Sequence, residues 1–483
     1  MIETEDMNDP LSLKPLCVDL DGTLLRTDLL VESLFLLLKK NILYVFLIPL
    51  WLFKGKANLK QKIADRVDID ATQLPYHHNF LDYLKQQHSA GRKLILATAS
   101  NIKFANAVAE HTAIFDSVLA SDAETNLSGS RKLAPLMVEY GEGGFDYAGN
   151  AMIDFKIWQH AGEVILVNPE RGVKAAADKA GYSQQLFDDR NGHPLLPYLK
   201  AVRLHQWLKN LLLFVPLVMA HQFADQWLLS QAILAFIAFG LCASSVYLLN
   251  DLLDLPDDRG HPTKCNRPFA AGSLSIVNGT LLIPVLLLSA IAIALLLPLN
   301  FLWTLLIYYG LTLAYSFKLK RIVLVDVLIL ASLYTIRIIA GAAAVSLEPT
   351  FWLLAFSMFF FLSLALVKRF TELLMLEKRG KSEAAGRGYS VVDLETLSHF
   401  GSTSAYMAVL VLALYINSET VKGLYSHPEV IWLLCPILLY MVTRIWFLAR
   451  RGELHEDPVV FVMSDKISLL IAVIGGLLLW LAV

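Results

Sequence analysis

With 483 residues the chain is long enough for two or three domains, and 56% of its residues are hydrophobic. Its 41 basic and 43 acidic residues leave a net charge of −2, and no nucleic-acid partner is expected. The cysteines show neither CxxC spacing nor a pairing pattern, which argues against a zinc or disulfide framework: Cys17, Cys242, Cys265 and Cys435.

Composition changes sharply near residue 200. The earlier part has the composition of a soluble protein, and the later part is a series of apolar runs. We therefore expect a soluble domain over 1–185, a linker over 186–202 and a membrane domain over 203–483. The linker contains the turn-forming residues Asp188 to Pro194. The N-terminus lacks the basic-then-apolar order of a signal peptide, so the soluble domain is expected in the cytosol.

Four short apolar segments of the soluble domain read as buried strands. They lie within residues 16–24, 93–100, 145–150 and 163–168 and alternate with helical stretches. This alternation predicts a largely parallel, doubly wound α/β sheet. Ligands of such sheets bind at the carboxyl ends of the strands, where the first segment carries two aspartates.

The first of these segments continues as Asp19-Leu20-Asp21-Gly22-Thr23. This motif resembles the signature of the haloacid dehalogenase-like hydrolases, and the later segments follow in that family's order. The resemblance implies a Rossmann-like phosphatase domain over nearly all of residues 1–185. It further implies that Asp19 is the nucleophile for a phosphoryl group and that Asp21 is the general acid and base.

The same resemblance assigns roles to residues after the later strands. Thr98 would bind phosphoryl oxygens, Lys132 would steady their charge, and Asp154 would hold Mg²⁺ together with Asp19. One position departs from the family pattern, because Asn150 stands where a second metal-side aspartate is usual. An amide oxygen can still contact a metal ion but carries less charge, so either an active phosphatase or a retained scaffold without catalysis fits this site.

An insertion follows the first strand, where hydrolases of this family place a helical cap, here about 26–90. It holds two apolar runs, 29–38 and 42–53, with lysines between and after them. Each run is too short to span a bilayer. The basic flanks suit a segment on an anionic membrane surface, and helices buried against the sheet are the equal alternative.

The membrane domain is predicted to be an all-α bundle of nine spans. They are placed at 208–222, 227–249, 276–298, 301–316, 323–345, 350–367, 403–417, 429–448 and 466–482. Basic residues such as Lys264, Lys320 and Arg450 gather in the connections after the even-numbered spans, and the other side holds Lys422. This asymmetry predicts a cytosolic N-terminal domain, an external C-terminus and, for a bacterial protein, the inner membrane.

One polar interruption, between the second and third predicted spans, carries clustered carboxylates. Asp251 and Asp254 share a helix face, and Asp258 follows beyond the break that Pro256 imposes. Clustered carboxylates suit Mg²⁺ bound to phosphate oxygens. The positive charges expected to bind a polyanion follow in the sequence: Lys264 and Arg267.

Read as Asn250-Asp251-x-x-Asp254-x-x-x-Asp258 with a later Asn-Arg-Pro, this stretch is similar to the first aspartate-rich motif of the UbiA-type prenyltransferase superfamily. Members bind a diphosphate through Mg²⁺. A second aspartate-rich motif is usual after the sixth span, and here basic residues stand in its place, from Lys368 and Arg369 onward. With Arg203 to Asn210 and Arg451 to Pro458, the pattern resembles the decaprenyl-phosphate phosphoribosyltransferase branch.

That resemblance implies 5-phosphoribosyl diphosphate as donor and a polyprenyl phosphate lipid as acceptor, with Asp251, Asp254 and Asp258 holding Mg²⁺ and Asn250 assisting. Further residues are expected to contact the substrates: Lys209, Lys318, Arg337, Lys368, Arg369 and Glu372. For Arg337 and Arg444, ion pairing between helices is an alternative. The fused domain would then remove the 5-phosphate of the lipid-linked product.

Two other functions remain open at this point. One is a prenyltransferase that moves a polyprenyl group from its diphosphate to an aromatic acceptor, against which the missing second motif argues. The other is a lipid transporter with a regulatory soluble domain. Polyprenyl length and oligomeric state are not indicated by the residues.

Overall fold

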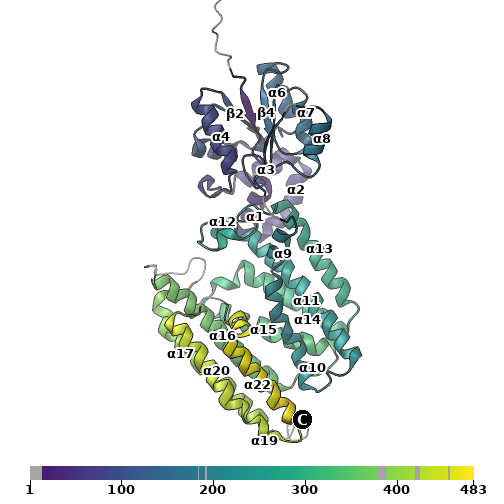
Figure 1. The fold of residues 1–483 in the computed structure, drawn as a ribbon, viewed down its shortest axis with the longest axis vertical. Coiled ribbons are helices and arrows are strands. Elements are labelled where there is room, and N and C mark those ends of the chain that lie inside the picture. Colours follow the sequence, from purple (N-terminus) through teal and green to yellow (C-terminus); the bar gives the residue numbers. More distant parts are fainter. Residues whose placement is uncertain are drawn as a thin grey trace, which may run out of the picture. The chain divides into compact units, whose positions relative to one another are not determined.

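The computed structural model describes residues 13–182, 184–190, 193–378, 380, 388–418, 425–454 and 457–482 (Figure 1). Parts of the predicted linker, of the basic run after Lys378 and of the stretch before the last span lie outside these residues, as does Lys422. The chain forms two compact units, Met1–Val202 with Leu248–Leu282, and Arg203–Tyr247 with Ile283–Val483.

The first unit contains a six-stranded sheet in which every paired strand is parallel. The strands are β1 (Leu16–Val18), β2 (Leu94–Asn101), β3 (Ser117–Ser121), β4 (Asp146–Gly149), β5 (Val164–Val167) and β6 (Gln184–Phe187). Their order is β3-β2-β1-β4-β5-β6, so the chain reverses direction across the sheet between β1 and β4. The predicted parallel, doubly wound α/β fold is confirmed.

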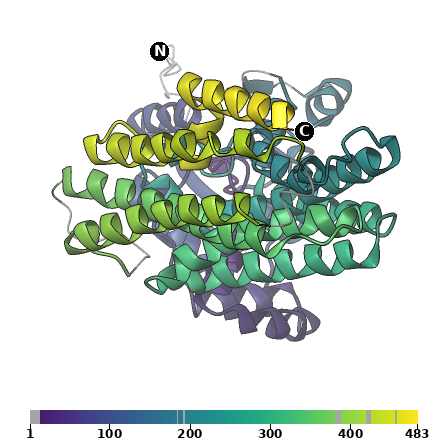
Figure 2. The same ribbon diagram turned by 90° about the horizontal axis from the view of Figure 1, so that it is seen from below.

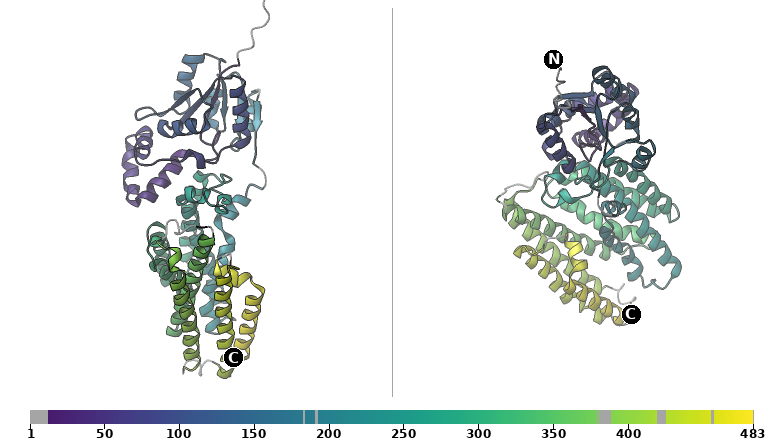
Figure 3. Two further views of the ribbon diagram at one scale, coloured as in Figure 1. Left: turned by 90° about the vertical axis from the view of Figure 1, so that its left-hand side faces the viewer. Right: turned by 45° about the horizontal axis from the view of Figure 1, so that its top comes forward.

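Side chains alternate between the two faces of this sheet, and each face has its own apolar core. Leu16 and Val18 face a core completed by α4 (His78–Ser89) and α5 (Ile102–Thr112). Cys17 faces the other, completed by three helices: α6 (Ser130–Tyr140), α7 (Phe155–Trp158) and α8 (Val173–Lys179). Helices therefore cover both faces, as Figures 1 and 3 show.

The insertion after β1 forms a small helical subdomain. It comprises α1 (Leu29–Lys40), the 3₁₀ helix η1 (Ile42–Phe46), α2 (Leu47–Phe53) and α3 (Lys56–Ala64). Asp28 caps α1 by accepting a hydrogen bond from the Val31 amide. A separate apolar cluster holds the subdomain together, with Leu37, Leu59, Ile63 and Val67 buried at its centre.

The rest of the chain is almost entirely helical. Its helices are α9 (Leu196–Val202), η4 (Leu204–Phe214), α10 (Val215–Met219), α11 (Gln226–Leu253), α12 (Leu255–Arg259), α13 (Ile276–Ala294), α14 (Leu299–Phe317), α15 (Val325–Ala344), α16 (Phe351–Lys378), α17 (Leu394–Ile416), α19 (Pro428–Ile431), α20 (Leu434–Arg451), α21 (Pro458–Ser464) and α22 (Lys466–Ala482). Within the second unit, α16 packs between α15 and α17, and α20 contacts both α17 and α22 (Figure 2).

Six of the described helices are long and apolar enough to cross a membrane, and the bent pair of α21 and α22 makes up to seven. The chain is therefore a multi-pass membrane protein, but the count of nine spans is not confirmed. The expected span at 208–222 is a 3₁₀ helix followed by the short α10, and together these are too short. The span at 301–316 corresponds to α14, in which tyrosines and Trp303 lower the mean hydropathy.

Candidate active sites

The first candidate site lies at the reversal point of the sheet, where β1 and β4 end side by side. Asp19 follows β1 directly, and its amide donates to the carbonyl of Ala148 in β4 over 3.0 Å. Asn150 follows β4 in the same way. Ligands of doubly wound sheets bind at such a reversal point, outside the carboxyl ends of the strands. The topology therefore brings the polar residues after β1 and β4 to one place.

A chain of hydrogen bonds joins Asp19 to Asp154. Lys132 Nζ donates to Asp19 Oδ1 over 2.7 Å and to the Tyr147 hydroxyl over 2.9 Å. The Tyr147 hydroxyl in turn donates to Asp154 Oδ1 over 3.4 Å. Burial, and after it the charge of Asp19, raises the pKa of Asp154 to about 6. Two carboxylates that repel one another in a buried site favour a cation between them.

Asp154 is also fixed from the backbone. Its Oδ2 accepts hydrogen bonds from the amides of Asn150 and Ala151 over 3.1 and 3.0 Å. The carboxylate lies so close above Gly149 that a Cβ there would be 2.6 Å from Oδ2, so a side chain would displace it. Two backbone amides and the close approach of Gly149 thus fix the position of the Asp154 carboxylate.

Asp21, two residues after Asp19, accepts hydrogen bonds from two donors. Ser100 Oγ donates to its Oδ2 over 2.6 Å, and the Leu29 amide at the start of α1 donates to its Oδ1 over 2.8 Å. Burial, and then the charge of Asp28, raises the pKa of Asp21 to about 7. A carboxyl group that keeps its proton near neutral pH is suited to general acid catalysis. Thr98, fully buried, accepts from the Ser100 amide.

The oxygen atoms here suit Mg²⁺, which takes hard oxygen ligands. Asp19 and Asp154 offer carboxylates, and Asn150 offers an amide oxygen that now accepts from Thr23 over 3.3 Å. Within the described residues, no three His, Cys, Asp or Glu side chains lie close enough together to hold a metal ion. A magnesium ion at this site would therefore take its remaining ligands from the amide, a substrate phosphate or water.

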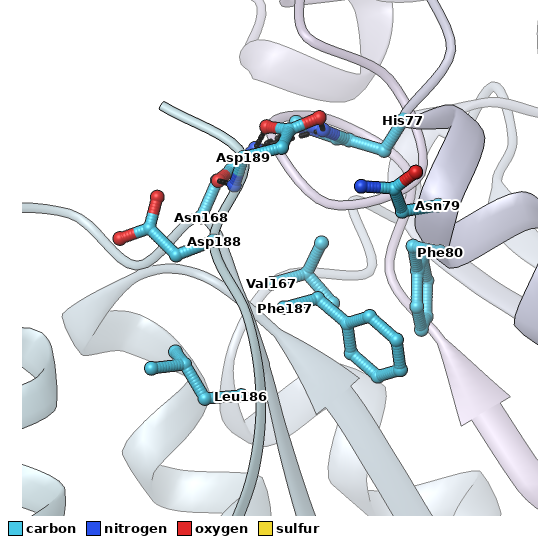
Figure 4. A pocket seen from close by; sticks show the side chains of 9 residues that line it. All are labelled: His77, Asn79, Phe80, Val167, Asn168, Leu186, Phe187, Asp188 and Asp189. Atoms are coloured by element: carbon cyan, nitrogen blue, oxygen red, sulfur yellow. Dashed lines mark hydrogen bonds and ion pairs between the residues drawn. The ribbon is translucent and has the colours of Figure 1, made fainter. Parts of the chain in front are cut away.

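A cavity of about 200 Å³ lies elsewhere in the same unit, beside the ends of β5 and β6. In Figure 4, His77 and Asp189 point toward one another at its rim. Asp189 also pairs with Arg26 and accepts from Asn168. Burial lowers the pKa of His77 to about 4, so this histidine is neutral at physiological pH. No sequence motif predicted this cluster.

The second candidate site is the aspartate motif, which begins in the last turn of α11 and continues into α12. Asp251 and Asp258 are nearly fully buried and share one partner, Arg267. Its Nη1 donates to Asp251 over 3.1 Å and to Asp258 over 2.7 Å. The break between α11 and α12 falls at Asp254, two residues before Pro256, and Asp258 lies beyond it, as predicted. Lys264, in contrast, is exposed.

Helix α1 contacts this motif within the first unit. Lys39, in its last turn, pairs with Asp254 over 3.2 Å and with the exposed Asp257 over 2.7 Å. Earlier in the same helix, the buried Glu32 accepts hydrogen bonds from both terminal nitrogens of Arg259, over 2.6 and 3.0 Å. Because the start of α1 donates to Asp21, this one helix touches both candidate sites.

The oxygen atoms of the aspartate motif are also of the kind that Mg²⁺ takes as ligands, but among the described residues Asp251, Asp254 and Asp258 do not lie close enough together to form a metal site by themselves. The side-chain oxygen of Asn250 is buried and has no hydrogen-bond partner among the described residues. A buried polar atom of this kind is costly unless something binds it. Arg267 and Lys39 now pair with the carboxylates of this motif. A metal ion bound here would replace these two cations, and substrate phosphates would complete the coordination of the ion.

A third polar cluster lies inside the second unit and is centred on Asp457. Lys209 and Lys368 both donate to Asp457 Oδ2, each over 2.9 Å. The Tyr334 hydroxyl contacts Oδ1 over 3.4 Å, and Lys209 lies over the Tyr334 ring. Two cations on one carboxylate oxygen make a site with positive charge to spare, which suits a phosphate.

Among the described residues, Arg337 has no carboxylate partner of the kind that was considered for it. Its guanidinium donates to Asn210 Oδ1 and to the Tyr308 hydroxyl, each over 3.1 Å. It also lies over the rings of Phe239, Tyr308 and Tyr334, 5.1–5.5 Å from their centroids. A buried cation held by aromatic faces and neutral oxygens retains its charge.

Arg369 is tied into a different network. It donates to Asp326 over 2.5 Å and pairs with Glu372, and Asp326 also accepts from the Tyr389 hydroxyl over 2.6 Å. Two carboxylates surround this one guanidinium, so Arg369 has no positive charge to spare, and the ion pair with Asp326 braces α16 against α15. Lys318 is exposed at the end of α14.

Arg444, for which ion pairing between helices was the alternative, pairs with Asp465 over 2.7 Å.

Several contributing residues were not assigned from the sequence. Ser100 and Tyr147 lie within the first site, and Tyr334 and Asp457 within the third cluster. Asp457 falls in the stretch Arg451 to Pro458 that stood out before the last span, so that stretch carried a usable signal. Tyr147 could be expected only from strand register, because it pairs with Cys17 beside Asp19.

Comparison with known proteins gives one family and several relatives. The model of the UbiA prenyltransferase family matches residues 211–470. The protein y4nM of Sinorhizobium fredii is 38% identical over 457 residues, 94% of this chain and 88% of that protein. Decaprenyl-phosphate phosphoribosyltransferase of Mycobacterium tuberculosis is 31% identical over 291 residues, 59% of this chain and 91% of that protein.

Among solved structures, a UbiA homolog from Archaeoglobus fulgidus bound to DMAPP and Mg²⁺ is 17% identical, with a TM-score of 0.46. The match covers 58% of this chain and 98% of that one.

Proposed function

Since the chain belongs to the UbiA prenyltransferase family, we propose that its membrane region transfers 5-phosphoribose from 5-phosphoribosyl diphosphate to a polyprenyl phosphate. The relatedness to decaprenyl-phosphate phosphoribosyltransferase supports this choice within the family. The observation that carries it is the cluster of Lys209, Lys368 and Asp457, in which cations predominate. A donor with a 5-phosphate and an acceptor with its own phosphate need such cations beyond a single diphosphate site.

In the proposed reaction, the bond between the ribose anomeric carbon and the diphosphate breaks, and a bond to an oxygen of the polyprenyl phosphate forms. Asp251, Asp254 and Asp258 would hold Mg²⁺ against the donor diphosphate, and the ion would offset the charge that develops on the leaving oxygens. Asn250 would assist, either as a metal ligand through its amide oxygen or as a hydrogen-bond donor to the diphosphate through its amide nitrogen. The attacking phosphate oxygen is already an anion, so the reaction requires no general base.

Lys209 and Lys368 would bind the phosphates that the aspartate motif does not hold. In the ligand-free chain Asp457 accepts from both lysines, as a phosphate oxygen would. Arg337 would add positive potential, because it is surrounded by aromatic rings and no carboxylate in the described part of the chain pairs with it. Arg369 and Glu372, being paired with one another, are assigned an indirect role in positioning.

For the N-terminal region we propose the removal of the 5-phosphate from the lipid-linked product. Asp19 would attack the phosphorus atom while the ribose oxygen leaves with a proton from Asp21, whose raised pKa suits this task. Water would then attack the aspartyl phosphate and return a proton to Asp21. Lys132, 2.7 Å from Asp19, would balance the charge on the phosphoryl oxygens. Asp154, with Asp19 and Asn150, would hold Mg²⁺ here.

Helix α1 supports the pairing of these two activities in one chain. The amide of Leu29, its first residue, donates a hydrogen bond to Asp21. Further along the helix, Glu32 and Lys39 pair with residues of the aspartate motif. Joining consecutive catalysts raises the effective concentration of an intermediate, often to about the millimolar range. The match to y4nM, which spans 94% of this chain, extends across both regions.

The test is a product analysis with the purified full chain, labelled 5-phosphoribosyl diphosphate and polyprenyl phosphate. Wild type should form lipid-linked ribose, and Asp19→Asn should accumulate its phosphorylated precursor. Asp251→Asn should lose about 10²–10³-fold in transfer rate. Asp257→Asn is the matched control, because Asp257 lies in the same motif but its side chain is 75% exposed.

Two outcomes would overturn the proposal. If labelled polyprenyl diphosphate and an aromatic acid react while the ribosyl donor is left intact, the membrane region is a conventional prenyltransferase. If Asp19→Asn yields the same products as wild type, the N-terminal region does not act on this lipid.

A further inference from the structure

The helical insertion of the first unit carries an apolar surface that nothing within the described residues covers. Residues 42–53, which form η1 and α2, are apolar on every side. The face that carries Tyr44, Ile48 and Trp51 packs inward on the cluster around Leu37 and Ile63. The remaining large side chains of this segment are exposed: Ile42, Leu43, Val45, Phe46, Leu47, Leu50, Leu52 and Phe53.

This distribution is unlike that of a helix at a water-facing surface, which is polar on its outer side. Phe46 and Phe53 are 73% and 89% exposed, and all the exposed apolar residues belong to one short segment. Patches of this kind on soluble domains mark a contact with a protein or a membrane. The alternative that the insertion buries its apolar runs against the sheet therefore fails for residues 42–53.

The inner side of the segment is fixed firmly enough to hold its outer side in place. Arg66 lies over the Trp51 ring, 5.0 Å from its centroid, and over the Tyr44 ring. The Asn41 side chain caps η1 by accepting from the Leu43 amide. The segment is thus a preformed element whose apolar face needs no rearrangement to become available.

Charge and length identify the partner. Lys40 comes immediately before the apolar segment, and Lys54 and Lys56 follow it, all three exposed. Apolar side chains bordered by lysines match a bilayer surface that contains anionic lipids. The segment has twelve residues, whereas a helical span needs about twenty. Because the chain is a multi-pass membrane protein, such a surface is always within reach of it.

We propose that residues 42–53 insert their exposed side chains into the interfacial layer of an anionic membrane and anchor the insertion there without crossing. The anchor would hold the insertion, and through α1 the start of the first candidate site, at the lipid surface. This proposal concerns attachment alone and stands whether or not the reaction proposed above is correct.

The experiment uses the full chain in proteoliposomes and a polarity-sensitive fluorophore on single cysteines. Cys265→Ser provides the background, because the other native cysteines are buried. Phe46→Cys and Phe53→Cys report on the apolar segment. Val138→Cys on α6 is the matched control, since Val138 is also 89% exposed. Quenchers are spin labels on lipid chains, placed near the headgroup or near the bilayer centre.

In vesicles with phosphatidylglycerol, labels at residues 46 and 53 should shift to shorter wavelength and lose emission to the shallow quencher, and the label at 138 should do neither. Replacing Lys54 and Lys56 with Gln, or using phosphatidylcholine alone, should weaken this quenching. Labels that stay unquenched at 46 and 53, as burial by a second copy of the chain would also produce, overturn the proposal. Stronger quenching from the bilayer centre would overturn it too, because the segment would then traverse the membrane.

Discussion

Replacing Asp457 with Asn is expected to destabilise the ligand-free protein. The carboxylate accepts hydrogen bonds from Lys209 and Lys368 at 2.9 Å, and its side chain is 15% exposed. Without it, two neighbouring ammonium groups keep their charges and lose their counter-ion. Removal of one partner from a buried ion pair typically costs about 3–5 kcal/mol. We expect the lower end of this range, because Lys368 is about a third exposed and solvent screens part of its charge.

The same change should tighten binding of pyrophosphate, if Lys209 and Lys368 are phosphate ligands. In wild type an incoming phosphate competes with Asp457 for both lysines, and in Asp457→Asn it does not. Recovering about 1.4 kcal/mol of the lost pairing would raise the affinity about tenfold. The measurement is thermal unfolding of the detergent-solubilised full chain, followed by tryptophan fluorescence across a titration with pyrophosphate.

Asp465→Asn serves as the comparison. Asp465 pairs with Arg444 in the same part of the chain, also through a partly buried carboxylate. Its loss should lower the unfolding midpoint, and pyrophosphate should raise that midpoint no more than in wild type. Equal responses of the two variants, or unchanged pyrophosphate affinity in Asp457→Asn, would refute the assignment of the lysines.

Three further changes test the N-terminal region. Lys132→Met should lower release of inorganic phosphate from the lipid-linked product by about 10²–10³-fold and leave ribosyl transfer intact, because it removes a charge 2.7 Å from Asp19; parallel loss of both activities would contradict this. Glu32→Gln should lower the thermal unfolding midpoint, since Arg259 loses a buried carboxylate at a typical cost of about 3–5 kcal/mol, and Glu32→Gln combined with Arg259→Met should recover part of the loss. Burial holds the pKa of His77 at about 4 in the folded chain against an ordinary 6.5, so the unfolded chain takes up a proton first and stability should fall by about 3 kcal/mol between pH 6.5 and 4. Denaturant titrations of His77→Gln should lack this component, and an identical pH dependence would rule out His77 as its source.

The sheet was predictable where strands are fully buried. β1 and β5 are continuous apolar runs, β2 and β4 are buried along almost their whole length, and all four were expected. The edge strands β3 and β6 were missed, because Ser117–Ser121 and Gln184–Phe187 mix polar with apolar residues. An edge strand is covered less completely than a central one, so its sequence carries a weaker signal.

In the membrane region, spans were predicted by counting apolar runs. The number of spans in the structure also depends on where each helix breaks. Residues 208–222 are apolar enough, yet the chain forms a 3₁₀ helix and then α10 over them. Arg203, at the start of this stretch, has a positive φ of 55°. Hydropathy reports the composition of a segment and carries no information on the point at which its helix ends.

In the candidate sites, the carboxylates could be predicted from short motifs. Their hydrogen-bond partners could not, because these partners lie far away in the sequence. Asp19, Asp21 and the aspartates at the end of α11 and beyond it were predicted directly from the sequence motifs. Asp457 is 248 residues from Lys209, and no local pattern links the two. Contacts of this kind follow from the packing of helices, which one sequence by itself does not specify. The roles assigned to these residues remain predictions.

The ion pair between Glu32 and Arg259 bears on how the N-terminal region can be isolated. A fragment that stops at Val202 would lack the guanidinium that matches Glu32, together with the Lys39 partners Asp254 and Asp257. Its α1 would lose the partners of both Glu32 and Lys39 beside an apolar segment that is already exposed, a combination prone to self-association. Soluble pieces of this protein should therefore retain residues 248–282 or be redesigned along α1.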